Sequence, residues 1–323
     1  MRRIIGFGLI LLICAIVAYA FAPRPPVQKP ATVQRFDRVM INDAKRVGDR
    51  IVAIGDAGRI FVSDDEGDTW RHVDSGTRST LTRLRALDEK TLIAVGHDAI
   101  ILKTDNAGDT WTELYSAPDA ESPLMDVLAL DEQRMVAIGA YHQYLQSLDG
   151  GANWEPVQVS DDDKHFNAIA RMGKDGLLLL GEAGTVLYSK DLGKTWGKVP
   201  TPYAGSYFGA VVIDDKTAIV FGMRGNLFRF TVGGKGLEKL DNDSKASLLG
   251  GEMADDAVVL VGQDGTALVS KDKGMTFNRQ RTSGSRIHTA VMKRKDGQWL
   301  AVGEQGAVVF KLAEAAPSEG VKQ

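Results

Sequence analysis

Cysteine is nearly absent from the sequence of 323 residues, where Cys14 is the only one. Cys14 lies in an apolar N-terminal segment, so the rest of the chain can form no disulfide bond, cysteine metal site or thiol nucleophile. An excess of charge of one sign is also missing, because 39 basic residues stand against 42 acidic ones. The chain therefore carries no overall field that would attract nucleic acid or an anionic membrane surface.

Several common catalytic motifs are missing as well. The sequence has neither the G-x-S-x-G elbow of serine hydrolases nor a glycine-rich P-loop. The Arg-Ile-Pro type of motif that marks a sialidase is absent, and no tyrosine segment stands out as a nucleophile site. We therefore expect a protein that is not an enzyme and that has no catalytic residue and no cofactor.

The N-terminal segment has the features of an export signal. Arg2 and Arg3 precede an uncharged run that extends from Ile4 to Pro23. Either this run is cleaved after Ala20, or it is retained as a membrane anchor, since it approaches the ~20 residues that a span needs. The basic flank favours export of the remainder of the chain, to the periplasm or a lumen. We assign residues 1–22 to a signal peptide or signal anchor, 23–31 to a proline-rich linker, 32–312 to the main domain and 313–323 to a disordered tail.

The main domain is built from internal repeats. An apolar run that ends in glycine recurs at intervals of 40 to 43 residues. The seven final glycines are Gly55, Gly96, Gly139, Gly181, Gly222, Gly262 and Gly303. Seven repeats of about 40 residues, each divisible into four short strands, predict an all-β fold, a seven-bladed β-propeller of antiparallel blades.

A second motif, S/T-x-D/N-x-G-x-T/N-W/F, follows five of these glycines and is an Asp box, also called a BNR-like repeat. Its Asp or Asn side chain can accept backbone N–H groups of its own turn, and its glycine can supply a positive φ. The aromatic residue would fill the gap between blades. We interpret all of these residues as structural rather than catalytic. They are Asp65, Gly67 and Trp70; Asn106, Gly108 and Trp111; Asp149, Gly151 and Trp154; Asp191, Gly193 and Trp196; and Asp272, Gly274 and Phe277.

The two ends of the main domain are expected to close the ring. The last repeat ends near Leu312, after its third strand. The segment from Thr32 to Arg38 can supply the fourth strand of that blade. Closure of this kind would protect an edge that otherwise invites aggregation.

The glycine-ended strands, the Asp boxes and the short turns such as Ala57-Gly58-Arg59-Ile60 resemble the photosystem II stability and assembly factor family, which has many members in non-photosynthetic bacteria. The resemblance covers roughly residues 36–312. It implies a lumenal or periplasmic propeller that aids assembly of a membrane complex, with a membrane protein or complex subunit as its partner and no nucleic acid. In photosynthetic members the resemblance implies a basic docking face.

The face opposite the Asp boxes is our candidate for partner binding, because loops on a rigid scaffold commonly carry function. It collects the blade-to-blade loops and the turns between second and third strands. We place on it Arg78, His97, Tyr141, His142, Lys164, His165, Tyr207, Arg224, Lys245 and Arg286, with Arg83 and His288 pointing into the central channel beneath. The histidines fall in different blades, so we expect no metal site.

A carbohydrate-directed function is the alternative, because Asp boxes also occur in sialidases and other glycoside hydrolases. Such an enzyme would need a pair of carboxylates or a tyrosine nucleophile with a glutamate partner. A module that binds a glycan or lipid without catalysis also remains open. Whether a purified domain retains a small ligand or captures a protein would separate these functions.

Overall fold

The computed structural model describes Leu12 and residues 35–120, 122–282 and 286–313. Apart from Leu12, the expected export segment and the linker lie outside these residues, as does most of the expected tail. Among the described residues, no helix has the length and apolar character needed to cross a membrane.

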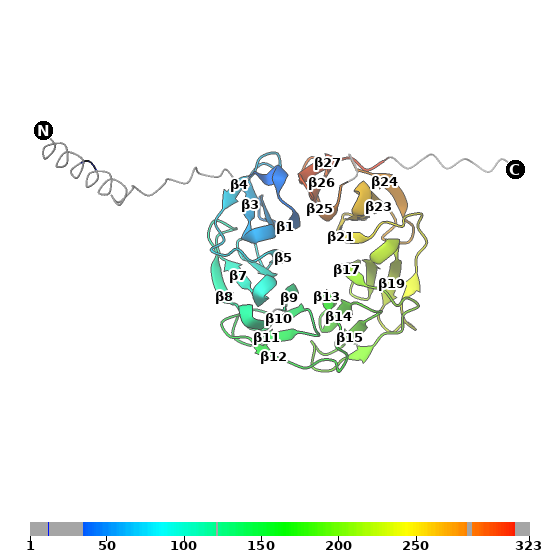
Figure 1. Cartoon of the computed structure of the whole chain (residues 1–323). Helices are drawn as coiled ribbons and strands as arrows, with labels where there is room; N and C mark the ends of the chain where they lie inside the picture. Colours follow the sequence, from blue (N-terminus) through cyan, green and yellow to red (C-terminus); the bar gives the residue numbers. More distant parts are fainter. Residues whose placement is uncertain (1–11, 13–34, 121, 283–285, 314–323) are drawn as a thin grey trace, which may run out of the picture. The chain divides into compact units, whose positions relative to one another are not determined.

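Seven small antiparallel sheets form a ring (Figure 1), and the strands of each sheet are hydrogen-bonded in chain order. Blade 1 contains β1 (Ile41–Val47), β2 (Arg50–Gly55), β3 (Ile60–Ser63) and β4 (Arg71–Val73), and blade 2 contains β5 (Leu81–Ala86), β6 (Leu92–Gly96), β7 (Ile101–Thr104) and β8 (Thr112–Tyr115). Blade 3 contains β9 (Leu124–Ala129), β10 (Met135–Gly139), β11 (Tyr144–Ser147) and β12 (Glu155–Pro156), and blade 4 contains β13 (Phe166–Met172), β14 (Gly176–Gly181), β15 (Val186–Ser189) and β16 (Gly197–Lys198).

The remaining blades follow the same order. Blade 5 contains β17 (Tyr207–Val212), β18 (Thr217–Gly222), β19 (Leu227–Thr231) and β20 (Glu238–Lys239), and blade 6 contains β21 (Leu248–Ala254), β22 (Ala257–Gly262), β23 (Thr266–Ser270) and β24 (Asn278–Arg281). Blade 7 contains β25 (His288–Lys293), β26 (Trp299–Gly303) and β27 (Gly306–Phe310). Within the described part of the chain, six 3-10 turns accompany the strands, at η1 (Phe36–Arg38), η2 (Asp56–Gly58), η3 (His97–Ala99), η4 (Pro118–Ala120), η5 (Met223–Gly225) and η6 (Gln263–Gly265). The predicted seven-bladed propeller is confirmed.

The closure of the ring differs from the prediction. Blade 7 has three strands among the described residues, and Phe36–Arg38 form the 3-10 turn η1 instead of part of a fourth strand. The Phe36 ring stacks on Trp70 with centroids 4.1 Å apart and meets Phe61 edge-on at 5.2 Å. For residues 36–38 the prediction was wrong, because packing on Trp70 and Phe61 holds them in a 3-10 turn that also contacts β27. Residues 32–34 of the predicted strand lie outside the described residues.

Polar contacts join blade 7 to blade 1 directly. The Thr289 hydroxyl donates to the Ile41 carbonyl at 2.7 Å. Arg46 donates to both oxygens of Glu66, at 2.6 and 2.8 Å, and to the Lys293 carbonyl at 3.2 Å. The ring is therefore closed by side chains of β1, β25 and the first Asp box.

The hydrophobic core is divided among the seven blade-to-blade interfaces. Each buried cluster combines strands of two neighbouring blades. Trp70, Trp111, Trp154, Trp196 and Phe277 each pack against one such cluster or belong to it, as the sequence predicts. Each clamps its own blade onto the preceding one, so burial of apolar area holds the ring together.

The Asp-box turns have the predicted chemistry. In the first box, Asp65 accepts the Thr69 backbone N–H at 2.8 Å and the Thr69 hydroxyl at 2.6 Å. Gly67 has a φ of 92°, and a Cβ there would lie 2.7 Å from Leu300, so both conformation and packing require glycine. In the fourth box, hydrogen bonds from Thr195 and Ser189 lower the pKa of Asp191 to about 2. These Asp-box carboxylates therefore stabilise their own turns through hydrogen bonds.

Candidate functional site

The predicted partner-binding residues occupy three different settings. Arg78, His97, Tyr141, Arg224 and Lys245 are exposed in the loops opposite the Asp boxes, and we call these loops the docking face. His142, Lys164, His165 and Arg286 are half-buried on the same side. Arg83 lies instead in the wall of the central channel.

Tyr207 was expected on the docking face but is fully buried, with no exposed surface. It begins β17, its ring contacts Phe228 edge-on at 5.7 Å, and its hydroxyl bonds to Thr201. His288, expected in the channel, is also buried, with Nε2 2.7 Å from the Thr282 hydroxyl. Both side chains are buried in the core, so a partner cannot contact them.

One group of predicted residues comes together between blades 3 and 4. The Tyr141 ring lies edge-on to His165, with centroids 4.8 Å apart, and the Tyr141 backbone N–H donates to His165 Nδ1 at 2.9 Å. His142 Nδ1 lies 3.2 Å from Asp163, and His142 N–H donates to the Lys164 carbonyl at 2.7 Å. Tyr141 is 56% exposed, so this group presents a fixed aromatic ring to solvent.

The backbone of this turn is strained. Tyr141 and His142 have φ values of 52° and 49°, which side chains other than glycine rarely adopt. At the position of His142, five of the other blades have glycine. The position of Tyr141 has a similar positive φ in every other blade, and blade 2 repeats both values at Asp98 and Ala99. The turn conformation is therefore a property of the repeat, and the exposed aromatic ring is what distinguishes blade 3.

The docking face is not basic as a whole. Where the structure describes them, its loops carry twelve acidic side chains, namely Asp56, Asp74, Asp98, Asp119, Asp161, Asp162, Asp163, Glu182, Asp241, Asp243, Asp264 and Glu304. They carry six basic side chains among the described residues, namely Arg59, Arg78, Lys164, Arg224, Lys245 and Arg286. The sequence-based prediction considered the cations of this face and not the acids around them. Because the acids outnumber the cations, this face has no positive field that would steer a partner toward it.

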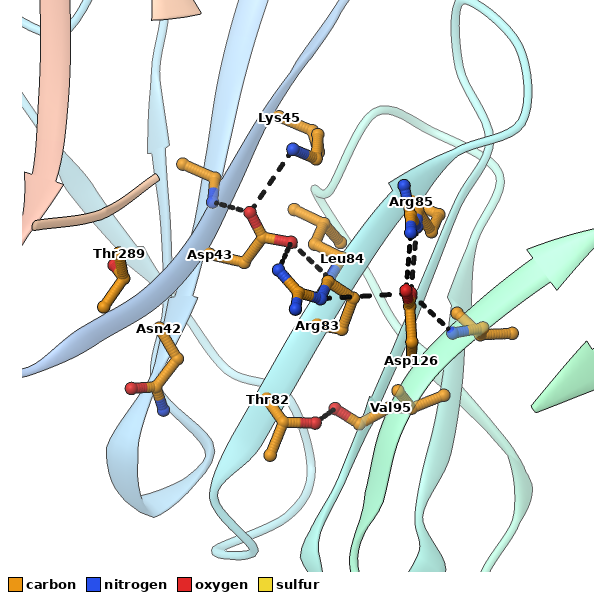
Figure 2. Close-up of polar contacts among 12 residues, drawn as sticks. Asn42, Asp43, Lys45, Thr82, Arg83, Leu84, Arg85, Val95, Asp126 and Thr289 are labelled. Carbon is orange, nitrogen blue, oxygen red and sulfur yellow. Dashed lines mark hydrogen bonds and ion pairs between the residues drawn. The ribbon is translucent and has the colours of Figure 1, made fainter. Parts of the chain in front are cut away.

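The wall of the central channel, in contrast to the docking face, carries more basic than acidic side chains. A cavity of about 390 Å³ is enclosed by the innermost strands, and its charged lining comprises Lys45, Arg83, Arg85 and Arg171 with Asp43, Asp126 and Glu252. Figure 2 shows that five of these side chains form a network across β1, β5 and β9. Most of this network was not predicted.

Asp126 is the best-bonded carboxylate of the network. Arg85 donates to both of its oxygens, at 2.9 and 2.6 Å, and the backbone N–H groups of Val127 and Ile169 donate at 2.8 and 3.1 Å. Burial favours the neutral acid, but attraction to Arg85 and Arg83 and these hydrogen bonds outweigh it, so the pKa of Asp126 is lowered. The carboxylate links blade 3 to blades 2 and 4.

Asp43 has a similar role between blades 1 and 2. It accepts the Ala44 N–H at 2.9 Å and the Leu84 N–H at 3.0 Å. Its cationic neighbours are more distant, with Lys45 Nζ at 3.4 Å and Arg83 at 3.9 Å. The hydrogen bonds of Asp43 are therefore to backbone N–H groups, and its contacts with the two cations are longer.

Comparisons with known proteins agree with this architecture. The chain is a seven-bladed Asp-box propeller whose inner strands enclose a partly charged channel. The family model described as photosynthesis system II assembly factor YCF48 matches residues 116–238. Over 174 residues the chain is 24% identical to the chloroplastic photosystem II stability/assembly factor HCF136 of Arabidopsis thaliana, a match that covers 50% of this chain and 36% of that protein. Over these residues the chain is similar to the YCF48/HCF136 photosystem II assembly factors, and it spans about a third of the length of HCF136.

Two solved structures show how widely the fold is used. YCF48 bound to D1 peptide is 16% identical and superimposes with a TM-score of 0.67, covering 90% of this chain and 98% of that one. A streptogramin B lyase is 12% identical with a TM-score of 0.74, covering 87% of this chain and 96% of the lyase. Because these likenesses establish only the fold, function must be argued from particular residues.

Proposed function

We propose that this propeller is an exported, non-catalytic assembly factor that holds a segment of a membrane protein against its docking face. The family supports an assembly role, and a YCF48 structure in complex with a D1 peptide supports recognition of a polypeptide. The observation that carries the choice of surface is the exposed Tyr141 ring, which is held edge-on to His165. Exposed aromatic residues on rigid turns are typical anchors of protein interfaces.

The acidic balance of the docking face changes the mechanism expected from the sequence. The cations Arg78, Arg224 and Lys245 make no ion pair among the described residues, so they remain available to single acceptor groups of a partner. They act by local pairing, whereas the surrounding acids disfavour partners of high negative charge. A weakly charged segment of a membrane protein suits this surface.

Site-specific photocrosslinking tests the choice of face. Tyr141 and Leu148 belong to the same blade, lie at its opposite ends and are 56% and 64% exposed. A photoreactive phenylalanine analogue at position 141 of the full chain should capture a membrane protein in native membranes, identified by mass spectrometry. The same analogue at position 148, in an Asp-box turn, should capture little. Preferential capture from position 148 would show that the Asp-box face is the working surface.

Export is tested separately. We propose that the propeller lies outside the cytoplasm, on the evidence of the apolar run that follows Arg2 and Arg3. A reporter that is active only after export, fused behind Gln323, should be active. Activity of a reporter that works only in the cytoplasm would exclude this location without affecting the choice of face.

A further inference from the structure

The central cavity has two unlike walls. The charged network of β1, β5 and β9 forms one side. Apolar side chains of β17 and β21, among them Phe208, Val211, Leu249 and Met253, line another part. A cavity of about 390 Å³ lies at the lower end of the range usual for small-molecule sites, which combine apolar walls with a few fixed polar groups.

Arg83 and Lys45 make no side-chain hydrogen bond among the described residues, and of the two only Arg83 lies near both carboxylates of the network. Its guanidinium lies 3.9 Å from an oxygen of Asp43 and 3.9 Å from an oxygen of Asp126, beyond hydrogen-bond distance. Its Nε atom is buried and has no hydrogen-bond partner among the described residues. The side chain is only 20% exposed, so its donors face the cavity wall and the cavity rather than open solvent.

The two aspartates cannot readily turn toward Arg83. Asp43 accepts hydrogen bonds from two backbone N–H groups. Asp126 accepts hydrogen bonds from two other backbone N–H groups and from two nitrogens of the Arg85 guanidinium. Moving either carboxylate would leave buried amides unsatisfied, which costs about 1–3 kcal/mol for each group. The donors of Arg83 are therefore available to a ligand that supplies its own acceptor oxygens.

We propose that the central channel binds a carboxylate that carries a compact apolar substituent, with Arg83 receiving the carboxylate and the β17–β21 wall receiving the apolar part. A planar carboxylate matches the fork of a guanidinium. A single negative charge fits a lining of four cations and three acids. A phosphate dianion would bring a second charge close to Asp43 and Asp126. The inference does not depend on the docking face.

Two sources can supply this chemistry, namely a free small acid and the C-terminus of a polypeptide. Isothermal titration calorimetry on the full chain in detergent compares N-acetyl-leucine, N-acetyl-Ala-Ala-Leu as the free acid, and N-acetyl-leucinamide. Both acids should bind and the amide should bind at least tenfold more weakly, since it lacks the charge that Arg83 receives. Tighter binding of the tripeptide would identify a chain terminus, and equal binding a small acid.

Variants separate the site from detergent or surface effects. Arg83→Met should weaken binding of the acids at least tenfold, whereas Arg279→Met, which removes the same charge from the exposed outer strand β24, should leave it unchanged. Ala170→Leu fills the cavity while keeping Arg83, so it tests the site even if Arg83→Met folds poorly. Absence of acid binding to the unaltered chain, equal binding of acid and amide, or binding insensitive to Ala170→Leu would overturn the proposal.

Discussion

Replacing Asp126 by alanine should be among the most damaging single changes to this propeller. The change removes the carboxylate that satisfies Arg85 and the N–H groups of Val127 and Ile169. The two N–H groups left unsatisfied cost about 1–3 kcal/mol each, and Arg85, whose side chain is 33% exposed to the channel, loses its partner at less than the cost for a fully buried pair, so the total is about 3–5 kcal/mol. For a domain of this size each kcal/mol lowers the unfolding midpoint by roughly 2 °C, so a fall of about 6–10 °C is expected.

Asp43→Ala is the matched control for Asp126→Ala. Asp43 is equally buried and also accepts two backbone N–H groups, but no cation donates a hydrogen bond to it. Its removal should cost only about 2 kcal/mol, or roughly half the shift seen for Asp126→Ala.

A double variant isolates the pair itself. Arg85→Met combined with Asp126→Leu should cost about 2 kcal/mol less than the sum of the single changes, because neither charge is then left unpaired. The midpoints are measured by circular dichroism on the full chain in the same detergent. If Asp126→Ala proved no more harmful than Asp43→Ala, the bidentate contact with Arg85 would not be a main stabiliser of the ring.

Two further changes test other parts of the ring. Burial raises the pKa of Glu252 above 4.5, so the native state binds the extra proton and stability falls as pH rises from 4.5 through the native pKa. Glu252→Gln should therefore gain in unfolding midpoint relative to the unaltered chain as pH rises from 4 to 8, and a constant difference would contradict this. Phe36→Ala removes the ring stacked on Trp70 and should cost roughly 2 kcal/mol in a thermal melt, since Phe36 is only partly buried. No loss would mean that η1 does not help to close the ring.

The blades could be predicted because their determinants are local. Each repeat was expected to divide into four short strands, and in the second repeat the structure has Leu81–Ala86, Leu92–Gly96, Ile101–Thr104 and Thr112–Tyr115. A glycine with a positive φ and an aspartate that accepts hydrogen bonds from its own turn form a motif of a few consecutive residues, which can be recognised in the sequence. The prediction that residues 36–38 belong to a closing strand was wrong because the packing of Phe36 on Trp70 joins residues far apart in the chain.

The channel could not be predicted because the inner strands are irregular. A register shift interrupts the pairing of β1 between Ile41 and Asp43, and that of β17 between Tyr207 and Gly209. Similar irregularities occur in each of the other inner strands. Because such a bulge changes which side chains share a face, simple alternation no longer assigns residues to the channel or the core. Asp43 and Asp126 were overlooked for this reason. Tyr207 was placed outside because it was assigned to a blade-to-blade loop, whereas it begins β17.

Acidic loops around a partly basic channel make a distinctive prediction for salt dependence. A carboxylate that enters the channel from the docking face passes the acids of that face before it reaches Arg83, so on this route the surface charge repels it while the channel attracts it. Salt screens the exposed acids strongly, with a Debye length of about 8 Å at 0.15 M, and screens the buried contact much less. The association rate of N-acetyl-Ala-Ala-Leu, measured by stopped-flow fluorescence, should therefore rise between about 0.01 and 0.15 M salt, while the dissociation rate changes little. A basic route of entry would give the reverse, a slower association at higher salt, and that result would exclude entry through the docking face.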